Sequence, residues 1–252
     1  PQTATPLAKP VLDEDRSPAS TADAVANRNP TGTEAPSPPD DLRPVPRTEQ
    51  LLVLGAIVLP IAGIAAAAVM LWGSGLHATD LATLAVFYLL SGFGVTVGYH
   101  RLFTHKGFDA PAPVRFAFAV MGSLAVQGSV MQWVGTHRRH HQKSDKPGDP
   151  HSPHGHGEGA WAAFKGFWHA HTGWLLASEQ AEVRRYAADL EADPVVRFVD
   201  RTFVLWVVLG LAIPAVIGGL VTATWTGAFT GFLWGGLIRV FLMHHVTWSV
   251  NS

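Results

Sequence analysis

The chain has 252 residues, of which 48% are hydrophobic and only 15% are charged, whereas about 25% of the residues in soluble domains are charged. The formal net charge of −1 provides no basic surface for nucleic acid. Cysteine is absent, which excludes disulfides, thiolate-bound haem and cysteine-held iron–sulfur clusters. Nine tryptophans fit the aromatic belts of a membrane protein, and any bound metal must be held by nitrogen or oxygen.

The first 48 residues differ in composition from the rest of the chain. They hold ten of the eighteen prolines, with alanine, threonine, serine and aspartate between them and no apolar periodicity. Such a segment cannot bury enough apolar surface to offset the entropy lost on ordering. We therefore predict a disordered Pro/Ala-rich tail over residues 1–48 and one membrane domain over residues 49–252.

Four apolar stretches are long enough to cross a bilayer. Residues 51–72 carry no charge and would span about 33 Å as a helix, which suits a hydrocarbon core of roughly 30 Å. Residues 81–99 follow after a short turn, and residues 202–222 and 226–243 form a second pair. The sequence therefore predicts an all-α, multi-pass integral membrane protein with four transmembrane helices in two hairpins.

A fifth apolar stretch, residues 114–134, contains polar residues such as Gln127 and Gln132. If this stretch crossed the bilayer, the histidine-rich segments before and after it would lie on opposite sides and could not share a site. We therefore predict an interfacial helix over 114–134 that lies against the other spans.

The positive charges indicate how the chain is oriented. Of the 18 Lys and Arg residues, five lie in the tail, twelve lie between Arg101 and Arg201, and the last is Arg239. By the positive-inside rule the N-terminus, the C-terminus and a histidine-rich helical cap over about 100–201 are cytosolic.

Two histidine clusters lie at the ends of apolar segments, namely His100-x4-His105 and His137-x2-His140-His141. Imidazole is the commonest neutral metal ligand. Positions i, i+3 and i+4 share one face of a helix, so the second cluster can aim at one point. Positions i and i+5 lie about 140° apart on an α-helix, so His100 and His105 converge only where the helix ends or bends.

These clusters predict a metal centre at the cytosolic ends of the membrane helices. Five imidazoles are more than one tetrahedral zinc site needs, which favours two metals. An all-imidazole shell suits iron, zinc, copper or nickel, so the ligands alone do not name the metal. The loop histidines His151, His154 and His156 are expected outside the site, and His169 and His171 are expected to pack or to support it. For His244 and His245, ligation and support stay equally open.

Three motifs carry a family resemblance: GYHRLFTHKGF at 98–108, THRRHHQKSDKPGDPHSP at 136–153 and HHVTWSVNS at 244–252. From about residue 50 the chain resembles the membrane-bound acyl-lipid and acyl-CoA Δ9 desaturases of the bacterial cell membrane. The resemblance implies two iron ions, with O2 as co-substrate, at the cytosolic face of a four-helix membrane fold. It implies the iron ligands His100, His105, His137, His140 and His141, with Asn251 bound through a water, and an acyl tunnel bent at Gln127, Trp133 and Thr247.

By the same resemblance, a saturated fatty acyl thioester of CoA or acyl carrier protein receives a cis double bond. Removing hydrogen from an unactivated CH2 pair needs a strong oxidant derived from O2 and two electrons, here from a ferredoxin- or cytochrome b5-type donor with its reductase. Gly135, Thr136, Ser178 and Glu179 stand where animal relatives carry basic residues for CoA. Acyl carrier protein or a lipid ester therefore stays open as the carrier.

The family pattern continues after the asparagine with another histidine and then a His-x2-His-His box. This chain ends at Ser252, so we expect a truncated fragment that lacks the family's C-terminal cap and third histidine box. The alternatives are an inactive remnant, a related membrane di-iron hydroxylase of fatty acids or alkanes, and a membrane metal transporter. Transport predicts ionisable residues inside the spans, and Arg239 is the one clear case.

Overall fold

The computed structural model describes residues 42–74, 76–144, 146–177 and 179–251. Within these residues the regular secondary structure is helical apart from one short two-stranded ladder, which confirms the all-α class. Residues 1–41, which make up most of the predicted tail, lie outside the described residues.

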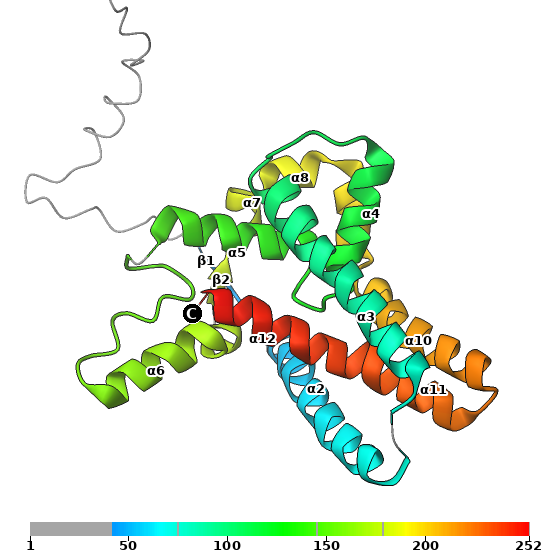
Figure 1. Cartoon of the computed structure of the whole chain (residues 1–252). Helices are drawn as coiled ribbons and strands as arrows, with labels where there is room; N and C mark the ends of the chain where they lie inside the picture. The colour runs from blue at the N-terminus through cyan, green and yellow to red at the C-terminus, as the bar shows by residue number, and fades with distance from the viewer. Residues whose placement is uncertain (1–41, 75, 145, 178, 252) are drawn as a thin grey trace, which may run out of the picture. The chain divides into compact units, whose positions relative to one another are not determined.

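Four long helices carry the apolar stretches expected to cross a membrane (Figure 1). They are α2 (Arg47–Ser74), α3 (Ala78–Phe93) continued by the π-helix η2 (Gly94–Thr104), α10 (Phe203–Thr222), and a continuous helix made of α11 (Trp225–Gly231), the π-helix η4 (Phe232–Ile238) and α12 (Arg239–Asn251). η2 and α12 continue well beyond the predicted ends at residues 99 and 243, because the helical hydrogen bonds continue into polar residues that a hydropathy criterion leaves out.

Small residues allow the second pair of long helices to pack closely. Gly218 on α10 faces the backbone of Gly227 on α11, and Gly231 faces the carbonyl group of Pro214. A Cβ atom at Gly218 or Gly231 would collide with that backbone. Lipid tails are as apolar as the helices, so such close van der Waals contact is a main source of helix association in a bilayer.

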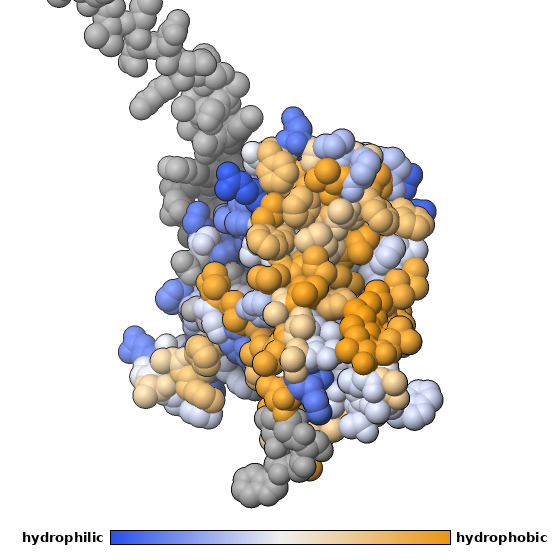
Figure 2. All heavy atoms as spheres, turned by 45° about the vertical axis from the view of Figure 1, so that its right-hand side comes forward, coloured by the Kyte–Doolittle hydropathy of each residue, from blue (hydrophilic) through white to orange (hydrophobic). Residues whose placement is uncertain are grey.

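The long helices expose large apolar side chains on their outer surface. Leu220 on α10 is 77% exposed and Val69 on α2 is 75% exposed. Figure 2 shows hydrophobic residues over much of one face of the molecule, with hydrophilic residues mostly around its edges. Soluble monomers rarely expose so much contiguous apolar surface, so this face fits a lipid environment.

Shorter helices gather near the end of η2, which carries the first histidine box, and near the end of α12 (Figure 1). They are α4 (Ala112–Ser123), α5 (Val130–Lys143), α6 (Ala160–His171), the 3-10 helix η3 (Gly173–Leu176), α7 (Val183–Tyr186), α8 (Ala188–Ala192) and α9 (Pro194–Arg201). Their core includes Tyr99 and Phe103 of η2, Val130 and Val134 of α5, and Val196 of α9. This core fixes η2 among the short helices.

The stretch 114–134 does not form the single helix predicted for it. α4 ends at Ser123, and α5 begins only at Val130. Between them Val126 and Gly128 have φ angles of 60° and 104°, which a right-handed helix cannot contain. The segment is therefore two helices joined by a turn.

Side chains of the last long helix hold this turn in place. Buried Arg239 donates to the carbonyl group of Leu124. His244 Nε2 lies 3.1 Å from the carbonyl oxygen of Ala125 and 2.9 Å from that of Val126. Both neighbours are acceptors, so Nε2 carries the proton. Arg239 and His244 are structural residues here, and the buried charge of Arg239 is accounted for without a transport function.

The predicted tail extends too far, because residues 42–48 are ordered. β1 (Leu42–Pro44) pairs antiparallel with β2 (Glu179–Ala181), with Arg43 opposite Gln180. Arg43 also forms an ion pair with Glu49 at 2.7 Å. Arg43 and Gln180 are 137 residues apart in the chain, so the local composition could not indicate the strand.

Candidate metal centre

The π-helix η2 brings together the two histidines of the first box. In a π-helix the N–H of residue i+5 donates to the carbonyl of residue i, so these residues lie about one turn apart. The N–H of His105 donates to the carbonyl of His100 at 3.1 Å, and their Nε2 atoms are 3.2 Å apart. The sequence predicted that the helix must end or bend between these two residues. η2 does end between them, at Thr104, and before it ends its turns widen to a π-helix.

The residues around the first box support the wide turn of η2. The Thr104 hydroxyl donates to the carbonyl of Tyr99 at 2.8 Å, five residues earlier. Tyr99 is fully buried, and its hydroxyl lies 3.0 Å from Ser123 Oγ on α4. Gly98 also packs against α4, where a Cβ atom would lie 2.9 Å from Phe118 Cβ. One face of η2 is thus anchored on α4.

The second box lies on α5, which is an ordinary α-helix. His137 and His141 are four residues apart, and their Nε2 atoms lie 3.1 Å from each other, as the i, i+4 spacing predicts. Trp133, one turn earlier, stacks on the His137 ring with 4.8 Å between ring centroids. This stacking fixes the orientation of His137.

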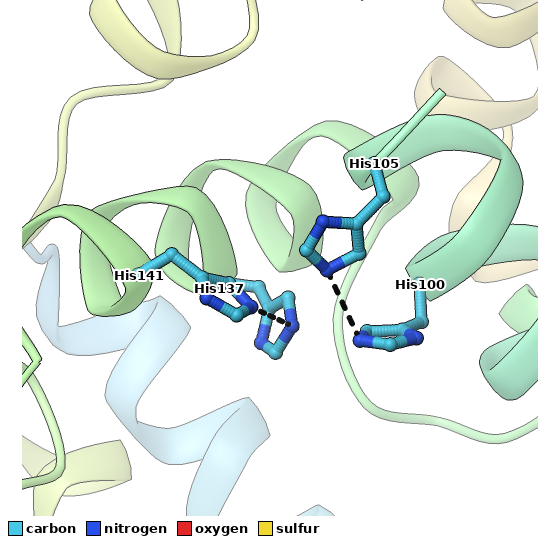
Figure 3. A group of neighbouring side chains, drawn as sticks. All are labelled: His100, His105, His137 and His141. Atoms are coloured by element: carbon cyan, nitrogen blue, oxygen red, sulfur yellow. Dashed lines mark hydrogen bonds between the residues drawn. The ribbon is translucent and has the colours of Figure 1, made fainter. Parts of the chain in front are cut away.

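Four histidines from these two helices converge (Figure 3). One ring nitrogen from each of His100, His105, His137 and His141 lies within 4.8 Å of the others. Between the helices, the ring centroids of His100 and His137 are 5.0 Å apart, and those of His105 and His141 are 4.7 Å apart. A single metal ion with nitrogen ligands at about 2.0–2.1 Å could bridge such a group after small ring movements.

The electrostatic setting of this four-histidine cluster fits a metal ion. Burial lowers the pKa of His137 from 6.5 to about 3, and neighbouring histidines, first His141, lower it as well. Burial and His105 also lower the pKa of His141. Metal ions bind the neutral imidazole, so protons compete weakly for these nitrogens near pH 7.

His140, the fifth histidine of the two boxes, does not belong to the four-histidine cluster. Its Nδ1 lies 2.9 Å from Oδ1 of Asp149, whose side chain is buried, and its ring centroid lies 4.1 Å from that of His151. His140, Asp149 and His151 each offer a ligand atom within 4.8 Å of the other two. A carboxylate at one imidazole nitrogen fixes the tautomer and leaves the second nitrogen for a metal.

His151 lies closer to the metal-binding residues than the sequence suggested. It is only 2% exposed, and burial together with His140 lowers its pKa to about 4. Its Nδ1 is buried without a hydrogen-bond partner in the described part of the chain. The loop after α5 folds back on the helix, so no helical spacing could reveal this neighbour of His140.

The remaining candidates lie elsewhere. Asn251 is the last residue of α12, and its side chain is outside the described residues. His171 Nε2 lies 3.0 Å from His245 Nδ1, and the ring centroids of His156 and His169 are 5.1 Å apart. These pairs join α6 to α12 and to the preceding loop, which is a packing role.

Two cavities flank His137. The larger, of about 470 Å³, is lined mainly by apolar side chains such as Leu89 and Met243. The smaller has a volume of about 100 Å³. Both are lined by Trp133, His137 and Thr247.

Of the three residues predicted to bend an acyl tunnel, Trp133 and Thr247 line both cavities and Gln127 lines the smaller one. Gln127 Nε2 donates to Thr247 Oγ1 at 2.9 Å and to the carbonyl of Met243 at 3.3 Å. Trp133 completes the wall by stacking on His137. The Gln127 side chain thus links the turn before α5 to Thr247 of α12, which lines both cavities.

The sequence matches the family described as "Fatty acid desaturase" over residues 79–251. A hex-5-enoyl-[acyl-carrier protein] acetylenase of Moorena producens (strain JHB) is 40% identical over 197 residues, which cover 77% of this chain and 61% of that protein. An sn-1 stearoyl-lipid 9-desaturase of Anabaena variabilis is 35% identical over 172 residues, covering 67% and 56%. A probable acyl-CoA desaturase of Schizosaccharomyces pombe is 30% identical over 205 residues, covering 80% and 39%. The chain thus spans 39–61% of the length of these relatives.

Proposed function

Because this chain belongs to the fatty acid desaturase family, we propose that it forms the membrane part of an oxygen-dependent fatty acyl desaturase. One observation carries this proposal: His100 and His137 belong to the four-histidine cluster and also line the larger, mainly apolar cavity. An alkyl chain in this cavity would lie beside the metal ligands and against mainly apolar side chains.

The substrate we propose is a saturated acyl thioester of CoA or acyl carrier protein that receives a cis double bond, with Δ9 as the expected position. The curated relatives include proteins named for acyl carrier protein, for a stearoyl-lipid and for acyl-CoA. Their range supports a fatty acyl chain as the common substrate, and a lipid ester is the alternative carrier.

The metal we propose is iron, which imidazole ligands suit. His100, His105, His137 and His141 would hold one ion, and His140, together with Asn251 through a water, would contribute to a second. When bound, two iron ions would let O2, two electrons from a ferredoxin- or cytochrome b5-type donor and two protons take up the two hydrogens of a CH2–CH2 unit and yield two waters.

The protein's own residues would position the acyl chain. Apolar side chains around the larger cavity would contact the alkyl chain along its length. Trp133 and Thr247 form the wall at which an alkyl chain reaching from one cavity into the other would pass His137. Gln127 holds Thr247 in place by its hydrogen bond. The distance from this wall to the end of the larger cavity would then select the carbons that react.

We also propose that the N-terminus and the metal centre face the cytosol of a bacterial cell. The twelve Lys and Arg residues between Arg101 and Arg201 support this orientation, because positive residues are retained on the cytosolic side. The apolar outer surface of the four long helices supports a multi-pass arrangement.

The test is expression of the protein in a host that lacks its own desaturase, followed by mass spectrometry of the fatty acids. We expect a cis monounsaturated product from the wild type and its loss in His141→Ala. A matched control is His154→Ala, which changes an exposed histidine of the loop and should leave the product unchanged.

Two results would contradict the proposal. A normal yield of the unsaturated product in His141→Ala would show that the reaction does not require the four-histidine cluster. A hydroxylated product in place of an unsaturated one would assign the chain to the related hydroxylases.

A further inference from the structure

The two histidine pairs of the cluster lie on different helices, so neither helix alone sets the distance between them. Within η2 and within α5 the Nε2 atoms are 3.2 and 3.1 Å apart. Between the helices, convergence depends on how the end of η2 sits against α5. A shift of one helix against the other would change the distance between the pairs, and metal–nitrogen distances tolerate only about 0.2 Å.

Arg138 connects the two helices at this level. It follows His137 on α5, and its guanidinium donates to the carbonyl oxygens of Phe103 at 2.7 Å and Thr104 at 3.3 Å. These are the last two residues of η2, directly before His105. The final carbonyls of a helix lack intrahelical donors and carry partial negative charge, so a cation is favourable there on both counts.

The remaining donors of Arg138 bind the segment that covers α5. Its two terminal nitrogens donate to the carboxylate of Asp189 at 2.6 and 3.1 Å, and one of them donates to the carbonyl of Tyr186 at 2.8 Å. With the two bonds to η2, all five N–H groups of the Arg138 guanidinium have an acceptor. Lysine has three donors and no planar fork, so it cannot reproduce this set.

The fold does not depend on Arg138 alone for the contact between η2 and α5. Buried apolar residues of both helices, such as Leu102 and Val134, already pack in one core. What Arg138 adds is a directional contact to the last turn of η2, where the histidines stand.

We infer that Arg138 is a positioning residue of the metal centre, which holds the end of η2 against α5 and thereby sets the distance between the two histidine pairs. This inference rests on the proposed metal function, and it assigns a role to a residue that is not itself a ligand.

The test is binding of Co2+ to the full chain purified in detergent, measured by calorimetry and by the visible absorption of bound Co2+. We expect Arg138→Met and Arg138→Lys to bind Co2+ at least about 10-fold more weakly than the wild type, the scale seen when a partner outside the ligand shell is lost, and with an altered absorption spectrum. Asp189→Asn keeps both bonds to η2 and should stay within about 3-fold. Arg197→Met is the matched control. Arg197 lies on α9, and its guanidinium donates to the carbonyl of Glu191 at 3.4 Å.

Three results would contradict the positioning role of Arg138. Folded Arg138 variants with wild-type affinity and spectrum would overturn the inference. So would a failure of both Arg138 variants to fold while Asp189→Asn folds, because Arg138 would then serve the fold as a whole. A wild-type protein that does not bind Co2+ would overturn the metal centre itself, and the inference with it.

Discussion

The two helices that carry the histidine boxes reach the same geometry by different backbones. The first pair, His100 on η2 and His105 directly after it, and the second pair, His137 and His141 on α5, have nearly equal Nε2 separations, 3.2 and 3.1 Å. On α5 the ordinary i, i+4 period is sufficient. On η2 the i, i+5 spacing needs a π-helix, which is rare and concentrated at functional sites. The comparison indicates that the first box depends on outside support, whereas the second is built into its own helix.

The largest expected effect comes from His137→Ala, because His137 contacts histidines of both pairs. The His137 ring lies 5.0 Å from that of His100 and 4.6 Å from that of His141. Affinity for Co2+ should fall by more than the roughly 10–100-fold typical of losing a partner outside the ligand shell. Calorimetry of the purified protein would measure this, with His154→Ala as control. An unchanged affinity would show that the metal does not bind between the helices.

Acidification should destabilise the metal-free protein through α5. Burial is the main cause that lowers the pKa of His137 from 6.5, the value of an exposed histidine, to about 3 in the folded chain. Below about pH 6.5 the unfolded chain therefore binds a proton at His137, whereas the folded chain does not. The free energy of unfolding is unaffected above that pH and falls as the pH drops toward about 3. One group contributes at most about 1.4 kcal/mol per pH unit, and solvent access to the ring reduces this.

The measurement is the melting temperature in detergent, followed by tryptophan fluorescence between pH 6.5 and about pH 4. His137→Ala should flatten the dependence, although His151, whose pKa is lowered to about 4, leaves part of it in place. If the melting temperature of His137→Ala depended on pH as steeply as that of the wild type, protonation of His137 would not be the cause.

A smaller effect tests the backbone support of η2 directly. Thr104→Val removes the hydroxyl that donates to the carbonyl of Tyr99. We expect the free energy of unfolding to fall by about 0.5–1.5 kcal/mol, as for one lost hydrogen bond, and Co2+ affinity to fall several-fold. Thr136→Val is the matched control, since Thr136 precedes His137 on α5 as Thr104 precedes His105 on η2. Equal losses of Co2+ affinity in both variants would contradict a special fragility of the first box.

The sequence was sufficient to predict the long helices and the two boxes, because apolar length and histidine spacing are local properties of the chain. It could not predict the π-helix, since both α and π backbones are compatible with the same residues and packing on α4 decides between them. It also missed the turn between α4 and α5, whose carbonyls bind Arg239 and His244 from more than 110 residues away. Asp149 and His151 were missed for a similar reason, because a loop without periodicity brings them to His140.

The smallest expected effect separates charge from geometry at the end of η2. Lys106 directly follows His105 and pairs with the same Asp189 as Arg138, at 3.0 Å, but its side chain is 65% exposed. An exposed ion pair contributes at most about 1 kcal/mol, so Lys106→Met should lower stability by less than that and leave Co2+ affinity unchanged. If Lys106→Met instead weakened Co2+ binding as much as Arg138→Lys, the shared contact with Asp189 would be what places η2. The carbonyl contacts of Arg138 with Phe103 and Thr104 would then be incidental, and the dependence of the first box on outside support would be a matter of charge.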